Sequence, residues 1–141
     1  MKPTKTKEKL KLSNDQIAFF NRNFNAEAFE KAKKVVLDAI SKSSSSLELW
    51  QNLSGYDRDI RYMDNYTVFL CDMELDRSKM ETTADYVGVS LFIYWNERNN
   101  TAKIRYAELY SSESYNKEVS FWFGFNPDTY EIESLDQIVW Q

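Results

Sequence analysis

The spacing of apolar residues changes once along this chain, near residue 56, and that change limits the folds that the sequence can adopt. Before it, apolar residues recur every three or four positions, as in an amphipathic helix; after it, they alternate with polar residues, as in a strand. A parallel sheet needs a crossover between strands, whereas here all the helical segments come first. The sequence therefore predicts an α+β fold, with two or three N-terminal helices packed on one face of a curved antiparallel meander of about five or six strands.

Three helical segments are predicted before residue 56. Ser13 and Gln16 form a capping box at the start of a first helix that ends near Asn23 to Asn25. Asn25 can cap a second helix, whose buried stripe is expected to contain Phe29, Ala32, Val35, Val36, Ala39 and Ile40. Ser46 is a candidate cap for one further turn, which contains Leu47, Leu49, Trp50 and Leu53.

The first four predicted strands, residues 58–63, 66–75, 84–96 and 101–110, form two hairpins. Asp64-Asn65 is the expected turn of the first hairpin. The second is expected to close with Asn96 opposite Thr101, which aligns apolar residues on one face. The partners are then Trp95 with Ala102, Ile93 with Ile104, Leu91 with Tyr106, Val87 with Tyr110, Phe92 with Arg105 and Tyr94 with Lys103.

A fifth strand is predicted over residues 117–125, with Phe121, Phe123 and Phe125 on one face. The turn at 126–129 then brings Tyr130 and Ile132 back beside this strand. The final apolar residues fit either a last strand or a short turn of helix.

Charge divides the chain into a basic start and an acidic body. Residues 1–12 carry five Lys and one Glu and are expected to form a flexible basic tail, with residues 13–141 as a single α+β domain. Residues 43–141 hold eight Lys/Arg against seventeen Asp/Glu, a net charge of −9. Such a body repels nucleic acid and attracts basic protein surfaces, so nucleic acid is expected to touch only the tail.

The expected cellular location follows from the lack of targeting and membrane segments in the sequence. No apolar run of signal-peptide length follows residues 1–12, and no stretch reaches the roughly 18 apolar residues of a membrane span. A cytoplasmic protein without a membrane segment is therefore expected.

The residue types argue against catalysis. The chain has no His, the commonest general base and metal ligand, and its single Cys71 lies on the apolar side of a predicted strand. Its three glycines are isolated, so no phosphate-binding loop is present. We therefore expect a protein that is not an enzyme, with no catalytic residues, no metal and no cofactor.

Carboxylates offer the main electrostatic feature. Asp57 and Asp59 share one face of a strand, as do Asp72, Glu74 and Asp76, with neighbours about 6.6–6.8 Å apart. Pairs at such spacing could serve glycoside hydrolysis or a hard cation, but here they lie where a strand leaves the sheet. They fit better a solvated face or an acidic surface that meets a basic partner.

Aromatic residues point away from the predicted core as well as into it. Tyr86, Phe92, Tyr94 and Trp122 fall on the opposite face of their strands from the apolar sets. If helices cover only one side of the sheet, these rings stand in water, where they are typical anchors of protein interfaces. Alternatively, the sheet curls and buries both faces, or the tail or the terminal segment covers these rings.

These features together predict a small, acidic, non-catalytic protein that binds a macromolecule. The expected type is an inhibitor, such as an immunity protein, an antitoxin or a phage-borne inhibitor, that occludes a basic partner, for example a nuclease. An exposed aromatic face also suits a homodimer. The alternative is a small-molecule pocket protein of a cone-shaped fold, similar to nuclear transport factor 2 (NTF2-like) or cystatin-like, with a cavity lined by Trp50, Tyr106, Phe123 and Tyr130.

Overall fold

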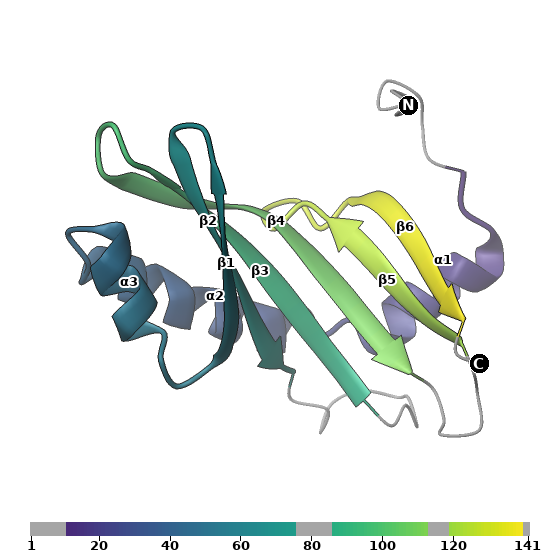
Figure 1. The fold of residues 1–141 in the computed structure, drawn as a ribbon. Coiled ribbons are helices and arrows are strands. Elements are labelled where there is room, and N and C mark those ends of the chain that lie inside the picture. The colour runs from purple at the N-terminus through teal and green to yellow at the C-terminus, as the bar shows by residue number, and fades with distance from the viewer. Residues whose placement is uncertain (1–10, 76–85, 113–118, 140–141) are drawn as a thin grey trace.

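The computed structural model describes residues 11–75, 86–112 and 119–139. It consists of three helices followed by one six-stranded sheet (Figure 1). The predicted division into a basic tail (1–12) and one domain (13–141) stays a prediction, because residues 1–10 lie outside the described ranges.

The helices begin where side chains satisfy their first backbone N–H groups. Helix α1 spans Asn14–Asn23, and the capping box between Ser13 and Gln16 is confirmed, with both of its hydrogen bonds present. Helix α2 spans Ala26–Ser41 and is capped by Asn25, as predicted. Helix α3 spans Ser46–Asn52, but its cap is Ser45, which accepts the backbone N–H of Glu48. The prediction of Ser46 was wrong by one residue because a run of four serines offers several possible caps.

The strands follow as an antiparallel meander in chain order. They are β1 (Asp57–Met63), β2 (Tyr66–Glu74), β3 (Tyr86–Asn96), β4 (Thr101–Ser112), β5 (Val119–Phe125) and β6 (Ile132–Val139). The sheet is curled and does not close, which confirms the α+β class and the curved meander. The final segment, which the sequence left open, is a strand.

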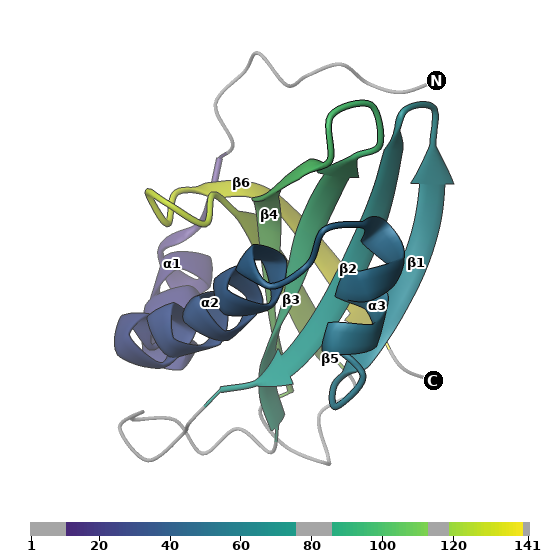
Figure 2. The same cartoon turned by 90° about the vertical axis from the view of Figure 1, so that its left-hand side faces the viewer.

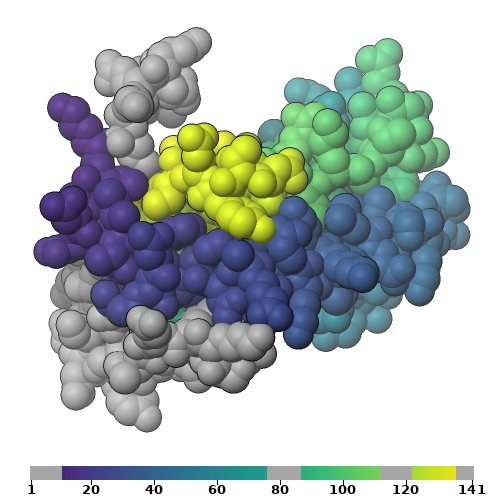
Figure 3. Space-filling model, turned by 180° about the vertical axis from the view of Figure 1, so that it is seen from behind, coloured from purple at the N-terminus to yellow at the C-terminus, as the bar shows by residue number. Residues whose placement is uncertain are grey.

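All three helices pack on one face of the sheet, here called the inner face (Figure 2). Ring contacts join α1 to β5 through Phe19 and Phe123, and α3 to β2 through Trp50 and Phe69. Seen from behind, α1 and α2 form much of the surface, and the connection between β5 and β6 lies beside α2 (Figure 3). There Lys33 donates a hydrogen bond to the carbonyl of Pro127 at 3.0 Å, which ties the connection to the helix.

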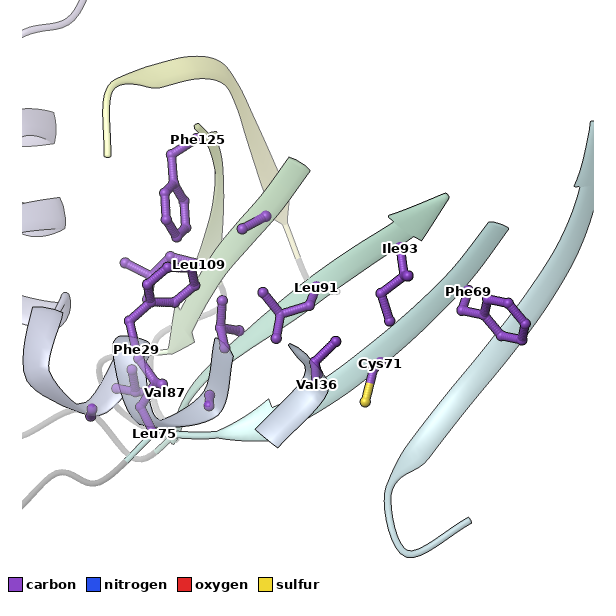
Figure 4. Packing of buried hydrophobic residues seen from close by; sticks show 14 of the residues in the cluster. Phe29, Val36, Phe69, Cys71, Leu75, Val87, Leu91, Ile93, Leu109 and Phe125 are labelled. Atoms are coloured by element: carbon purple, nitrogen blue, oxygen red, sulfur yellow. The ribbon is translucent and has the colours of Figure 1, made fainter. Parts of the chain in front are cut away.

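The core lies between the helices and the inner face (Figure 4). The alternation predicted for β3 is confirmed, since its inner-face residues Val87, Val89, Leu91, Ile93 and Trp95 are all buried. On α2, the predicted stripe is buried at Phe29, Ala32, Val36 and Ala39, but Val35 is 39% exposed. Val35 precedes Val36, and adjacent positions on a helix point about 100° apart, so only one of them can face the sheet squarely.

A β-bulge changes the pairing of β3 with β4. Near the turn the prediction is confirmed: Trp95 pairs with Ala102, Ile93 with Ile104 and Tyr94 with Lys103. The register then shifts between Ile93 and Phe92, and Arg105 is the extra residue. Beyond the bulge the prediction is wrong by one position, since the pairs are Phe92 with Tyr106, Leu91 with Ala107 and Val87 with Ser111.

The bulge keeps apolar side chains in the core. Strict alternation from Ile104 would turn Ala107 and Leu109 away from the helices and turn Tyr106 and Tyr110 inward. The extra residue reverses this, so that Ala107 and Leu109 are fully buried on the inner face. Tyr106 and Tyr110 consequently lie on the opposite face.

Deletion of Arg105 tests this role of the bulge. The deletion joins Ile104 directly to Tyr106, so a regular strand still keeps Ala107 and Leu109 on the inner face, and the free energy of unfolding should change by less than about 1 kcal/mol. Insertion of one alanine between Glu108 and Leu109 should instead turn Leu109 outward and lower the free energy of unfolding by about 2–5 kcal/mol, the cost of losing a buried leucine. Chemical denaturation followed by circular dichroism compares the two, and equal midpoints would contradict the assignment.

Candidate functional site

The sheet face opposite the helices, here called the outer face, carries most of the predicted site residues. Directly paired residues of antiparallel strands share a face, so the register defines rows that cross the sheet. The four rows are Glu74–Gly88–Tyr110–Trp122; Asp57–Asp72–Ser90–Glu108–Gly124–Ser134; Asp59–Leu70–Phe92–Tyr106; and Arg61–Val68–Tyr94–Lys103.

Aromatic rings on the outer face lie against one another. Tyr110 stacks on Trp122 with ring centroids 4.5 Å apart, and Phe92 meets Tyr106 edge to face at 5.3 Å. Tyr110 is only 7% exposed, while Phe92, Tyr106 and Trp122 are half-buried. The rings therefore form an ordered layer that leaves part of each ring accessible.

Two glycines allow these rings to lie close to the backbone. A Cβ on Gly88 would stand 2.7 Å from the Tyr110 ring, and a Cβ on Gly124 would collide with the Tyr106 and Ser134 hydroxyls. Those two hydroxyls are hydrogen-bonded to each other across Gly124. Glycine inside a strand often marks such a close approach, so the isolated glycines have a role in packing the outer face.

The predicted aromatic residues are placed as follows. Phe92, Tyr94 and Trp122 lie on the outer face and are half-buried, while the side chain of Tyr86, the first residue of β3, lies outside the described residues. The Trp122 Nε1 is buried and has no acceptor within the described ranges. Sequence reasoning missed Leu70, Tyr106 and Tyr110 on this face. For the two tyrosines, the signal was the three-residue step from Ile104 to Ala107, which marks the bulge.

Four of the five predicted acids share one end of the outer face. Asp57 is paired with Asp72, Asp59 follows on β1, and Glu74 ends β2. Asp76 lies outside the described residues. Burial raises the pKa of Asp72, the negative charges of Asp57 and Asp59 add to this, and the hydrogen bond donated by the Ser90 hydroxyl opposes it. Asp57, Asp59 and Asp72 thus lie close enough to influence one another.

The other end of the outer face is basic. Arg61 and Lys103 end the fourth row, and the bulge residue Arg105 lies beside them. The Arg105 guanidinium is 5.4 Å from the ring centroid of Tyr94 and 5.6 Å from that of Tyr66. The face is therefore polarised: the carboxylates of β1 and β2 lie in the first three rows, Arg61 and Lys103 lie in the fourth, and the rings of β3, β4 and β5 lie beside them in the same rows.

The chemically reactive groups are few. Burial raises the pKa of the Cys71 thiol to about 12, so this side chain stays protonated on the inner face. Within the described ranges, no group of three or more His, Cys, Asp or Glu is placed to hold a metal ion. In the same part of the chain, no helix is long and apolar enough to cross a membrane.

The four residues proposed to line a small-molecule cavity do not come together. Tyr106 lies on the outer face, whereas Phe123 is fully buried on the inner face against Phe19. Tyr130 packs on Phe24 and Phe29 and hydrogen-bonds to Glu30. Trp50 lines a different, half-open pocket of about 310 Å³, together with Ser46, Leu47, Ile60, Tyr62, Thr67 and Glu97.

Comparison with known proteins gives no relative. No protein-family model matches the chain, and no curated protein or solved structure is significantly similar to it. Within the described residues, the fold is that of an α+β protein whose helices cover the inner face of the sheet and leave the outer face uncovered.

Replacing Asp72 by Asn tests the electrostatics of the acidic end. A raised pKa means that the folded state binds the proton more tightly, so stability falls as pH rises from the ordinary Asp pKa through the raised one. Asp72→Asn should therefore gain stability relative to the parent at about pH 7, by less than about 1 kcal/mol because the group is half-exposed. The gain should vanish at about pH 3.

Thermal unfolding at the two pH values measures this difference. Glu131→Gln, in the exposed connection between β5 and β6, serves as the control for removing a carboxylate elsewhere. If Asp72→Asn differs from the parent in stability by the same amount at both pH values, the pKa of Asp72 is not raised in the folded protein as described.

Proposed function

We propose that the protein binds a larger partner through the outer face and acts by steric occlusion, as small immunity proteins, antitoxins and phage-borne inhibitors do. The observation that carries this proposal is the outer face, which none of the three described helices covers and where ordered aromatic rings lie beside four carboxylates. Tyrosine and tryptophan in such a setting are the usual anchors of protein interfaces.

The ordered rings favour tight binding because little freedom remains to be lost. Trp122 is held by its stack on Tyr110, and Tyr106 is held by Phe92 and by its hydrogen bond to Ser134. Immobilising a flexible side chain on binding costs about 0.5–1.5 kcal/mol, a cost that these contacts have already met in the folded protein.

The acidic end specifies the chemistry of the partner. Asp57, Asp59, Asp72 and Glu74 match a basic surface, such as that of a nuclease, and should accelerate the encounter. The cations at the opposite end, Arg61, Lys103 and Arg105, repel the same basic surface and so orient it. The proposed protein needs neither catalysis nor a cofactor, and a cytoplasmic location suits it.

Affinity capture with matched baits tests the face. The parent chain should retain a basic protein from the lysate of its native cell, and the Glu131→Lys bait should retain the same protein. The Glu74→Lys bait, which reverses one charge within the acidic end, should lose much of it. Phe92→Ala should weaken binding roughly 30-fold or more if this ring is a hot spot.

The rate of association supplies a second readout. Once the partner is isolated, its association rate with the parent chain should fall steeply as salt is added, because screening weakens the attraction. A rate that is flat from low to high ionic strength contradicts the electrostatic part of the proposal. Equal capture by all four baits contradicts the assignment of the outer face.

A small-molecule site is a second proposal, supported by the pocket beside α3. Its walls are largely apolar, and the Glu97 carboxylate accepts a hydrogen bond from Thr67 at its rim. Such a pocket suits a short alkylammonium ion, whose chain would contact Leu47 and Tyr62. Titration with butylammonium should shift the amide resonances of Thr67 and Glu97, and should not do so in Glu97→Gln; unchanged resonances in the parent would exclude this ligand.

A further inference from the structure

Strand β1 forms one edge of the sheet and pairs only with β2 among the described strands. The two-residue turn Asp64-Asn65 makes Met63 and Tyr66 a hydrogen-bonded pair. Odd-numbered residues of β1 therefore direct their backbone groups to β2, and Arg58, Ile60 and Tyr62 direct theirs to the free edge. The structure agrees, because the Ile60 N–H is bound at 2.8 Å by the side chain of its neighbour Asp59 and not by β2.

This edge carries charged side chains, a usual protection against pairing, but their signs alternate along the strand, so that they can complement a second strand. It is seven residues long, contains no proline and lies open at the side of the sheet (Figure 2). Its aromatic Tyr62 is 77% exposed, which is the largest exposed fraction among the large hydrophobic side chains described. An unpaired strand of this kind is a template for another strand.

We infer that the occupant of this edge is a second copy of the same strand, paired antiparallel about a twofold axis at Ile60. In this register Asp59 of each copy lies opposite Arg61 of the other, so two pairs of opposite charges form on the outer face. On the inner face Ile60 meets Ile60, and Arg58 meets Tyr62. Arg58, Ile60 and Tyr62, whose backbone groups point to the free edge, then pair only with one another across the twofold axis.

Charge selects this register over its neighbours. Hydrogen bonding permits only shifts by two residues, because a one-residue shift would pair an edge-facing residue with one that faces β2. One such shift places Asp59 opposite Asp59, and the other places Arg61 opposite Arg61. Like charges directly opposite each other are destabilising, so of these three registers only the one centred on Ile60 is free of them.

The same register covers groups that the single chain leaves incomplete. The Arg58 guanidinium stacks on Trp50 at 3.8 Å, and its buried Nε has no acceptor within the described ranges. Tyr62 of the second copy would lie beside it and bring both a ring and a hydroxyl. Asp59 would release the Ile60 N–H to the Ile60 carbonyl of the second copy and turn to Arg61.

The resulting dimer would join the two sheets into one, with both outer faces on the same side. This inference does not rest on the proposed function, since the rings and the residue Glu74 used to test that function lie away from the free edge of β1. A monomeric protein would overturn the dimer and leave the partner-binding proposal standing.

Charge reversal with rescue tests the register. By size-exclusion chromatography with light scattering, the parent chain should show twice its 16.7 kDa mass. Asp59→Arg alone and Arg61→Asp alone each place like charges opposite each other twice, and should weaken the dimer by about tenfold or more. An equimolar mixture of the two variants should recover the dimer, because every opposing pair is then again of opposite charge.

Controls separate this outcome from simple changes in net charge or folding. Glu131→Arg makes the same change in charge as Asp59→Arg away from the edge and should stay dimeric. If one single variant fails to fold, the double variant Asp59→Arg/Arg61→Asp, which restores both pairs, should still dimerise. A parent chain of single mass, or single variants that dimerise as well as the parent, would overturn the inference.

Discussion

Burial of one sheet face under three helices is the constraint on which the other features of this protein depend. The inner-face residues of β3 are fully or nearly fully buried, and Phe29 and Val36 of α2 lie in the same core. Each buried side chain of this size contributes about 1.5–3 kcal/mol, so the register that buries them all is strongly favoured. The β-bulge at Arg105 follows from this preference, because regular alternation through Arg105 would turn Ala107 and Leu109 away from the helices.

The composition of the outer face is a consequence of the same choice. Once the bulge has turned Tyr106 and Tyr110 outward, they need room above the sheet, and Gly124 and Gly88 provide it. Stacking then orders the rings, although none of the three described helices covers them. An ordered, partly exposed aromatic layer is unusual for a surface that has only to meet water, and this is the physical ground for treating it as a binding face.

Charges divide the outer face and extend to its edge. The carboxylates lie where β1 begins and β2 ends, and the cations lie near the turn between β3 and β4. On β1 the two signs alternate within one strand, so the edge is complementary to itself when read in the opposite direction. The outer face is thus complementary to a charged partner, and the edge strand β1 is complementary to the same strand of a second copy.

The sequence by itself determined the order of the elements, two of the three helix caps, the hairpin at Asp64-Asn65 and the inner face of β3, because caps, turns and alternation depend on near neighbours. It also placed Asp57 with Asp59 and Asp72 with Glu74, each pair on one face of its strand, and Phe92 and Tyr94 on the face away from the core, because period two fixes the face within a strand. Only the tertiary structure decided where the alternation of β4 reverses, and hence that Tyr106 and Tyr110 lie on the outer face. That choice depends on which residues meet the helices across the sheet, and a contact between residues distant in the chain leaves only a weak local trace, here the three-residue step from Ile104 to Ala107.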